Sequence, residues 1–151
     1  VVVTLKETIK SDIVTALKAS NELAVTTLRN AIGEIERREM AGKQRVELSD
    51  VETLAVIKGE INKRRETAKV YEDAGANDRA VREREEADFL SGYVPADLER
   101  RDVEAIIEKA FADTGATTMA DMGAVMKQVT AEVAGRYSGK EISDIVRSKL
   151  G

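Results

Sequence analysis

The sequence contains no cysteine and no histidine, and these two absences exclude several kinds of site. Without cysteine there is no disulfide, no thiolate zinc site and no cysteine nucleophile. Without histidine the chain lacks the usual general base near neutral pH, which excludes Ser-His-Asp and Cys-His catalysis and imidazole metal sites. No other nucleophile–base pair and no serine-rich, amidase-type pattern appears, so an enzyme is the least favoured class.

Proline, aromatic residues and long apolar runs are also scarce. The 151 residues include one proline and only 3% aromatic residues. No run approaches the roughly 18 apolar residues that a membrane span needs, and the N-terminus lacks a charged-then-apolar signal pattern. We therefore expect a cytoplasmic protein without membrane contacts.

The charges are nearly balanced, with 24 Lys and Arg against 28 Asp and Glu and a net charge of -4. Residues 96–151 contain 8 of the basic and 10 of the acidic side chains, so each half carries a net charge of -2. This balance argues against a bulk-basic nucleic-acid binder, and we expect no binding to DNA. A local basic patch is still compatible with it.

Long stretches of Ala, Leu, Glu, Lys and Arg with a single proline predict an all-α protein. Apolar residues recur at helical spacing along seven segments, and several segments open on a capping box, such as Thr4 with Glu7 or Ser49 with Glu52. The predicted helices cover about residues 5–16, 21–41, 49–75 and 77–94 before the proline, and 98–115, 118–135 and 138–150 after it.

Pro95 marks the predicted boundary between two units. Proline cannot continue a helix from within, and it biases the preceding residue away from helical backbone angles. We therefore predict an N-terminal four-helix domain, residues 1–95, joined near the proline to a C-terminal three-helix domain, residues 96–151.

The helix predicted after Thr118 carries Met119, Met122 and Met126 on one face. Methionine stripes can form adaptable grooves for partners, but with valines at the following positions they are more often core, and we predict core. Gly123 lies inside the same helix, where glycine costs about 1 kcal/mol relative to alanine. We therefore expect a neighbouring helix to approach the backbone closely there.

Two groups of short motifs, one in each half, stand out by their order and spacing: Lys63-Arg64-Arg65, Tyr71-Glu72, Gly75, Glu83, Glu86 and Tyr93-Val94-Pro95, then Asp121-Met122-Gly123-Ala124-Val125-Met126 and Gly135-Arg136. In this order and spacing they resemble the YqeY-like family, and the resemblance covers essentially the whole chain.

The resemblance implies a four-helix N-terminal unit, a linker and a small helical C-terminal unit. In this family the second half is similar to the tail domain of the B subunit of the glutamine-dependent tRNA amidotransferase, which helps to hold tRNA during transamidation. Members are associated with carbon–nitrogen ligase activity with glutamine as amide donor, although stand-alone members lack the amidotransferase body. The family often has Gly-Arg after the long helix, whereas here Gly75 precedes Ala76 and Asn77, so no role of that arginine is transferred.

The apolar stripes of two predicted helices are each interrupted by a charge. Helical steps along residues 49–75 reach Arg64, and steps along residues 77–94 reach Glu83, so both side chains should face the core. Because a lone buried charge is strongly unfavourable, we predict that Arg64 pairs with Glu83, or with Glu86 one turn later, in a partly buried bidentate contact. The alternative is an exposed Arg64 that binds phosphate.

The helix predicted after Gly75 carries several acidic residues close together, and one interpretation of them is a helical metal site. These residues are Glu83, Glu85, Glu86 and Asp88. Di-iron bundles, however, require Glu-x-x-His pairs on two helices, and the chain has no histidine. We predict no metal and no other cofactor.

Residues 135–140 are the candidate segment for RNA contact. Free N–H groups at the start of the last helix, with Arg136 and Lys140 beside them, suit a phosphate, and Tyr137 suits stacking on a base or ribose. A capped loop with ordinary surface charges is an equally weighted alternative. The candidate RNA-binding residues are Lys127, Arg136, Tyr137, Lys140, Arg147 and Lys149.

These observations and the resemblance together predict a non-catalytic accessory protein in translation. Its C-terminal unit is expected to bind tRNA or an amidotransferase-like complex, with weak and strongly salt-dependent RNA affinity. The alternative is a protein–protein adaptor with no RNA role, in which the methionine-lined helix or the N-terminal bundle docks a partner.

Overall fold

The structure is a computed structural model that describes residues 3–151. Within that range the backbone forms seven α-helices, one short 3₁₀ turn and no strand, which confirms the predicted all-α class. None of these helices combines the length and the apolar character needed to cross a bilayer. The chain divides into two compact units, the first ending at Val94 and the second beginning at Pro95.

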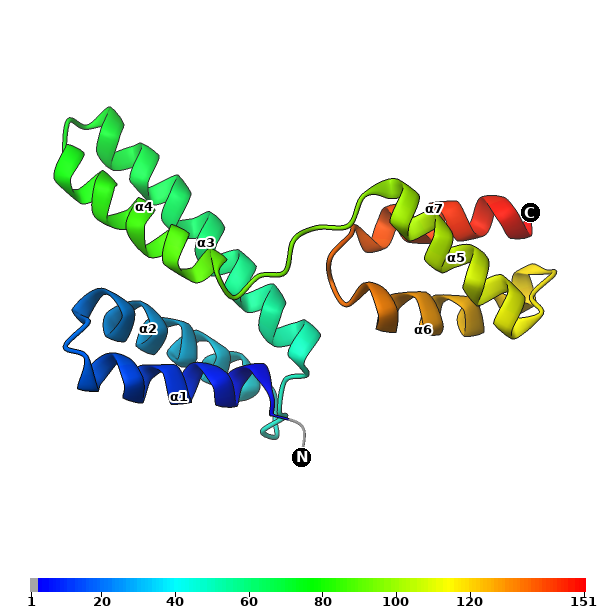
Figure 1. Cartoon of the computed structure of the whole chain (residues 1–151), viewed down its shortest axis with the longest axis horizontal. Helices are drawn as coiled ribbons and strands as arrows, with labels where there is room; N and C mark the ends of the chain where they lie inside the picture. The colour runs from blue at the N-terminus through cyan, green and yellow to red at the C-terminus, as the bar shows by residue number, and fades with distance from the viewer. Residues whose placement is uncertain (1–2) are drawn as a thin grey trace. The chain divides into compact units, whose positions relative to one another are not determined.

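The N-terminal unit consists of two antiparallel helical hairpins (Figure 1). Helices α1 (Leu5–Lys18) and α2 (Glu22–Glu39) form the first, and α3 (Asp50–Asp73) and α4 (Asn77–Ser91) form the second. Helix α2 also packs against α3 and α4. All four helices contribute to one apolar core, made of Ile9, Leu28, Ala31, Ile35, Val56, Ile57, Ile61, Ala87 and Leu90.

Local signals set the ends of these helices. Thr4 opens α1 and Ser49 opens α3, each in the capping box expected from the sequence. Gly75 follows α3 with a φ of 77°, a left-handed backbone angle that glycine adopts without a Cβ clash. Helix α4 then begins at Asn77, and its N-cap residue, Ala76, forms no side-chain cap hydrogen bond.

A buried charge cluster ties the first hairpin to the loop that follows it. The Glu39 side chain is fully buried, and its Oε1 lies 2.6 Å from Lys6 Nζ on α1. Glu39 Oε2 accepts a hydrogen bond from the Leu48 N–H at 3.1 Å, and Arg45 Nη2 lies 3.7 Å from Glu39 Oε1. The hydrogen bonds from Lys6 and Leu48 lower the pKa of Glu39 below its ordinary value. The carboxylate therefore fixes the loop against α1 and α2.

The C-terminal unit has a core of its own. Helices α5 (Arg100–Thr114), α6 (Met122–Val133) and α7 (Gly139–Leu150) pack against one another, with the 3₁₀ turn η1 (Met119–Asp121) leading into α6. The Leu98 N–H donates to a carbonyl oxygen of the α6–α7 connection and holds the segment before α5 in place. The core consists of Val103, Ile107, Ala110, Val125, Val129, Val133, Ile142, Ile145, Val146 and Leu150.

The methionine-bearing segment differs from the prediction at two positions. The Thr118 capping box opens the 3₁₀ turn, and the α-helix begins only at Met122. Because a 3₁₀ turn has three residues per turn, Met119 leaves the helical stripe and is 47% exposed, so its core assignment was wrong. Met122 and Met126 do pack against the core, partly buried. The expected close approach at Gly123 was also wrong, since an added Cβ would meet no atom within 4 Å.

Candidate functional site

A polar cleft of about 560 Å³ lies in the N-terminal unit, between α2 on one side and α3 and α4 on the other. Its volume is in the range of small-molecule pockets, but such pockets are usually lined by apolar side chains. Here every lining side chain is polar or charged. The lining residues are Asn30, Gly33, Glu34, Arg37, Glu60, Lys63, Arg64, Thr67, Glu83 and Glu86.

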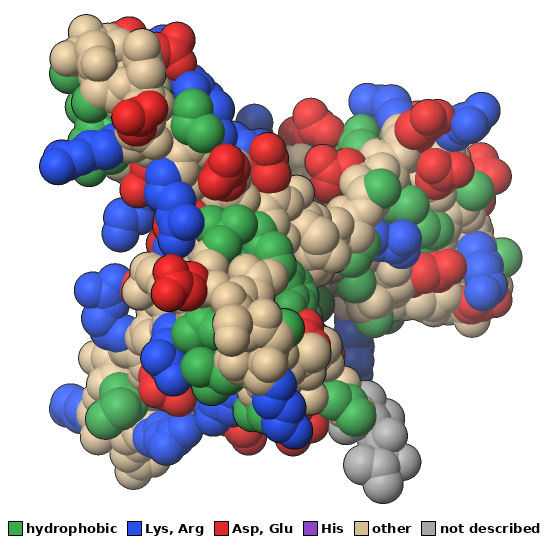
Figure 2. Space-filling model, turned by 60° about the vertical axis from the view of Figure 1, so that its left-hand side comes forward, with side chains coloured by type: hydrophobic (Ala, Val, Ile, Leu, Met, Phe, Trp, Pro, Cys, Tyr) green, Lys and Arg blue, Asp and Glu red, His purple; other side chains and the backbone are tan. Residues whose placement is uncertain are grey.

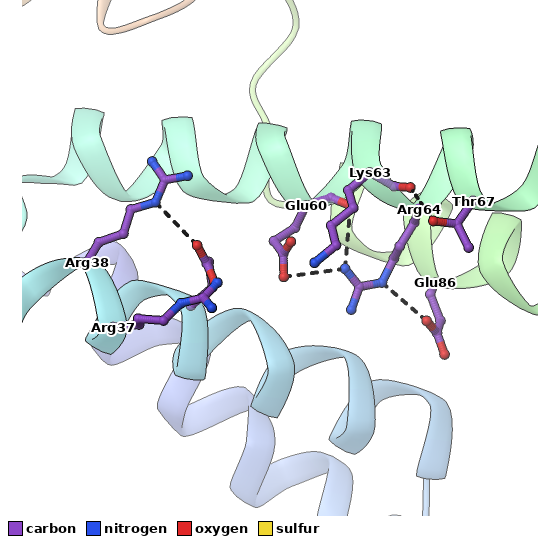
Figure 3. A network of polar contacts seen from close by, with 8 residues as sticks. Arg37, Arg38, Glu60, Lys63, Arg64, Thr67 and Glu86 are labelled. Atoms are coloured by element: carbon purple, nitrogen blue, oxygen red, sulfur yellow. Dashed lines mark hydrogen bonds and ion pairs between the residues drawn. The ribbon is translucent and has the colours of Figure 1, made fainter. Parts of the chain in front are cut away.

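Arg64 is the most buried cation of this cleft, with 7% exposure. Its Nε donates to Glu86 Oε2 at 3.2 Å, and its Nη1 lies 3.4 Å from the Glu60 carbonyl oxygen and 3.6 Å from Glu60 Oε1 (Figure 3). Arg82 Nε donates to the other oxygen of Glu86 at 3.1 Å. The structure therefore brings Arg64 to Glu86, the second partner considered from the sequence. Glu60 was missed, although its i,i+4 spacing from Arg64 was a usable signal.

Glu83, the first partner considered for Arg64, lines the cleft without a hydrogen bond or ion pair to any residue in 3–151. Burial raises the pKa of this carboxyl above its ordinary value, and the nearby charge of Glu86 adds to the effect. Arg64, Arg82 and Lys63 act in the opposite direction. Glu83 is therefore a half-buried carboxylate that lies near three cations and is bonded to none of them.

In the C-terminal unit, Arg136 is engaged with the backbone. Its Nε donates to the Val133 carbonyl oxygen at 3.0 Å and its Nη2 donates to that of Glu132 at 3.1 Å, so the guanidinium caps the end of α6. This role escaped the sequence analysis because it depends on the left-handed backbone at Ala134 and Gly135, with φ of 48° and 78°. A phosphate would have to share this guanidinium with two carbonyl oxygens.

Acidic and hydroxyl groups occupy the start of α7. Ser138 Oγ accepts a hydrogen bond from the Glu141 N–H at 3.3 Å and caps the helix. Burial and the hydrogen bond to Glu141 raise the pKa of the Tyr137 hydroxyl. The Glu141 carboxylate therefore already lies at the helix N-terminus, where the dipole favours a negative charge.

The other four candidates lie on the surface. Arg147 is 3.5 Å from Asp144, whereas Lys127, Lys140 and Lys149 are exposed and form no ion pair within residues 3–151. Over the C-terminal unit in Figure 2, acidic and basic side chains are interspersed rather than gathered by sign. Three lysines are thus the candidate cations that remain free to bind an anion.

Acidic side chains on neighbouring helices form no metal site in the part of the chain that the structure describes. Across residues 3–151, no three or more Asp and Glu side chains are grouped so that they could hold an ion. The row of acids on α4 instead contributes Glu86 to the Arg64 network and points Glu83 into the cleft.

Comparison with known proteins agrees with the motifs. The family model of the Yqey-like proteins matches residues 6–150, and no curated protein matches the sequence. Because this match spans nearly the whole chain and both units, the chain belongs to the YqeY-like family.

Proposed function

We propose that this chain is a non-catalytic accessory protein that binds tRNA, or an amidotransferase-like complex that handles tRNA, through its C-terminal unit. The observation that supports the proposal is the family match over residues 6–150, since the second half of this family resembles the tRNA-holding tail domain of an amidotransferase subunit. The C-terminal unit has its own core, as a separate binding module requires.

The contact itself is assigned to the three lysines that no acidic neighbour binds, Lys127, Lys140 and Lys149. Arg136 is a poorer anchor because its guanidinium caps α6. Three phosphate contacts predict weak binding, with a slope of about -2 to -3 in the logarithm of affinity against that of salt concentration.

Fluorescence anisotropy tests this proposal by comparing the affinity of the protein for labelled bulk tRNA with its affinity for a labelled duplex RNA of similar charge. Both affinities are measured at low and at near-physiological salt. We expect saturable binding that prefers tRNA and persists at the higher salt. Equal, salt-sensitive binding to both RNAs, or no binding, would mean that the resemblance marks the fold alone.

A triple variant separates the proposed contact from bulk charge. The variant carries Lys127→Ala, Lys140→Ala and Lys149→Ala, and it should bind tRNA more weakly and with a flatter salt dependence. The matched control carries Lys18→Ala, Lys43→Ala and Lys69→Ala, which remove the same charge from exposed lysines of the N-terminal unit. This control should bind tRNA as the unchanged protein does. An equal loss in both triple variants would contradict the assignment.

A protein–protein adaptor without an RNA role is the second candidate. The observation that favours the adaptor is at the start of α7, where the Glu141 carboxylate occupies the position at the helix N-terminus that an RNA phosphate would take. Affinity purification from cells distinguishes the two functions. The adaptor is supported if no RNA is recovered with the protein before nuclease treatment and a protein partner stays bound after that treatment.

A further inference from the structure

The cleft of the N-terminal unit lies outside the proposed RNA contact, and it contains a guanidinium that is held in one position. Glu86 binds Arg64 Nε and Glu60 binds Nη1, while Arg82 holds Glu86 from its other side. Arg64 Nη2 has no such partner within residues 3–151, and in Figure 3 it is the terminal nitrogen without a dashed line. Because the side chain is already ordered, it loses little conformational entropy when it binds a further acceptor.

Charges of opposite sign are left unpaired in the same cleft. The carboxylate of Glu83 has no ion-pair partner, and neither has the ammonium of Lys63, in the described part of the chain. Both Lys63 and Arg64 lie near enough to Glu83 to act on its charge. The four carboxylates of the cleft lining would repel a polyanion, and the three cations of the lining would repel a polycation. A small ligand that carries one charge of each sign is complementary to this arrangement.

Gly33 keeps the α2 wall of the cleft open. It lies in the middle of α2, and an added Cβ would meet no atom within 4 Å. Glycine inside a helix is destabilising relative to alanine, and neither a turn nor a close helix contact requires it here. Gly33 therefore leaves open space at a point of the cleft wall from which any other residue would project a side chain.

We propose that this cleft binds a free α-amino acid as its zwitterion. The α-carboxylate accepts hydrogen bonds from Arg64 Nη2 and Lys63 Nζ, and the α-ammonium donates to the carboxylate of Glu83. A volume of about 560 Å³ leaves room for the side chain of the amino acid. The site is independent of the proposed RNA contact, because all of its residues belong to α2, α3 and α4.

Titration of the whole ¹⁵N-labelled chain with the twenty L-amino acids, first mixed and then singly, tests the proposal through amide chemical shifts. We expect saturable shifts on α2, α3 and α4 for at least one amino acid. Its N-acetyl derivative lacks the ammonium and its amide derivative lacks the carboxylate, and each should bind about 10- to 100-fold more weakly. No saturable shift for any amino acid, or equal binding of either derivative, would overturn the proposal.

Two variants place the ligand in the cleft. Gly33→Gln places a side chain in the cleft and should abolish binding, whereas Gly59→Gln should preserve it. Gly59 is a matched control because it also lies inside a helix with open space at its Cβ, but outside the cleft lining. Glu83→Gln should weaken binding of the amino acid about 10- to 100-fold. The affinity of this variant for the amino acid should then be close to the affinity of the unchanged protein for the N-acetyl derivative. Undiminished binding by Gly33→Gln would exclude this site, and circular dichroism verifies that each variant is folded.

Discussion

Replacing Arg64 with methionine should lower the free energy of unfolding of the N-terminal unit by about 3–5 kcal/mol. Arg64, Glu60 and Glu86 are only 7%, 8% and 9% exposed, so water screens the cluster poorly. Methionine has a similar length and helix propensity, and it removes only the charge and the hydrogen bonds. It leaves the buried carboxylate of Glu60 without a cation and leaves Glu86 with Arg82 alone.

Urea denaturation followed by circular dichroism at pH 7 measures this loss. Because the chain has two units that can unfold separately, hydrogen exchange is needed to show that the lost protection lies in α3 and α4. Arg65→Met is the control, since Arg65 is the exposed neighbour on the same helix, and it should change stability by less than about 0.5 kcal/mol.

A loss below about 1 kcal/mol for Arg64→Met would refute this reasoning, because that is the value expected of a solvent-screened surface pair. The double variant Arg64→Met with Glu86→Met gives a second check. It should be more stable than Arg64→Met alone, because it also removes one of the carboxylates that the single substitution leaves in the interior.

Three further predictions concern buried or half-buried polar groups. Thr27 Oγ1 is buried without a hydrogen-bond partner in residues 3–151, so the isosteric Thr27→Val should raise the free energy of unfolding by about 1 kcal/mol in urea denaturation, and a decrease would contradict this. The lowered pKa of Glu39 means that its contribution to stability is present above pH 4.5 and is lost as the pH falls further. Glu39→Gln should therefore flatten the acid side of a profile of Tm against pH, and an unchanged profile would be inconsistent with this coupling. The pKa of Glu83 is raised, so its charge destabilises the native state at neutral pH. Glu83→Gln should raise Tm at pH 7, and the gain should shrink towards acid pH as the native carboxyl takes up its own proton; a gain independent of pH would argue against this cause.

The amino-acid sequence by itself determined the helices, because the signals that form them are local. Apolar spacing and capping residues act within one or two turns, so α1 and α3 begin after Thr4 and Ser49 as predicted. The family, too, could be read from the order of short motifs along the chain. The interruption of two apolar stripes was enough to indicate that Arg64 requires a carboxylate from the next helix, since an unpaired charge is so unfavourable in a core.

Only the tertiary structure decided which groups meet. Glu83 and Glu86 are one turn apart, and the rotation of α4 against α3 selects Glu86 for Arg64 and leaves Glu83 facing the cleft. The capping of α6 by Arg136 depends on two left-handed residues, Ala134 and Gly135, whose angles a helical pattern does not encode. The partners in these contacts are set by distances and rotamers between separate helices. Such choices follow from the packing of whole elements, which periodicity along one chain does not specify.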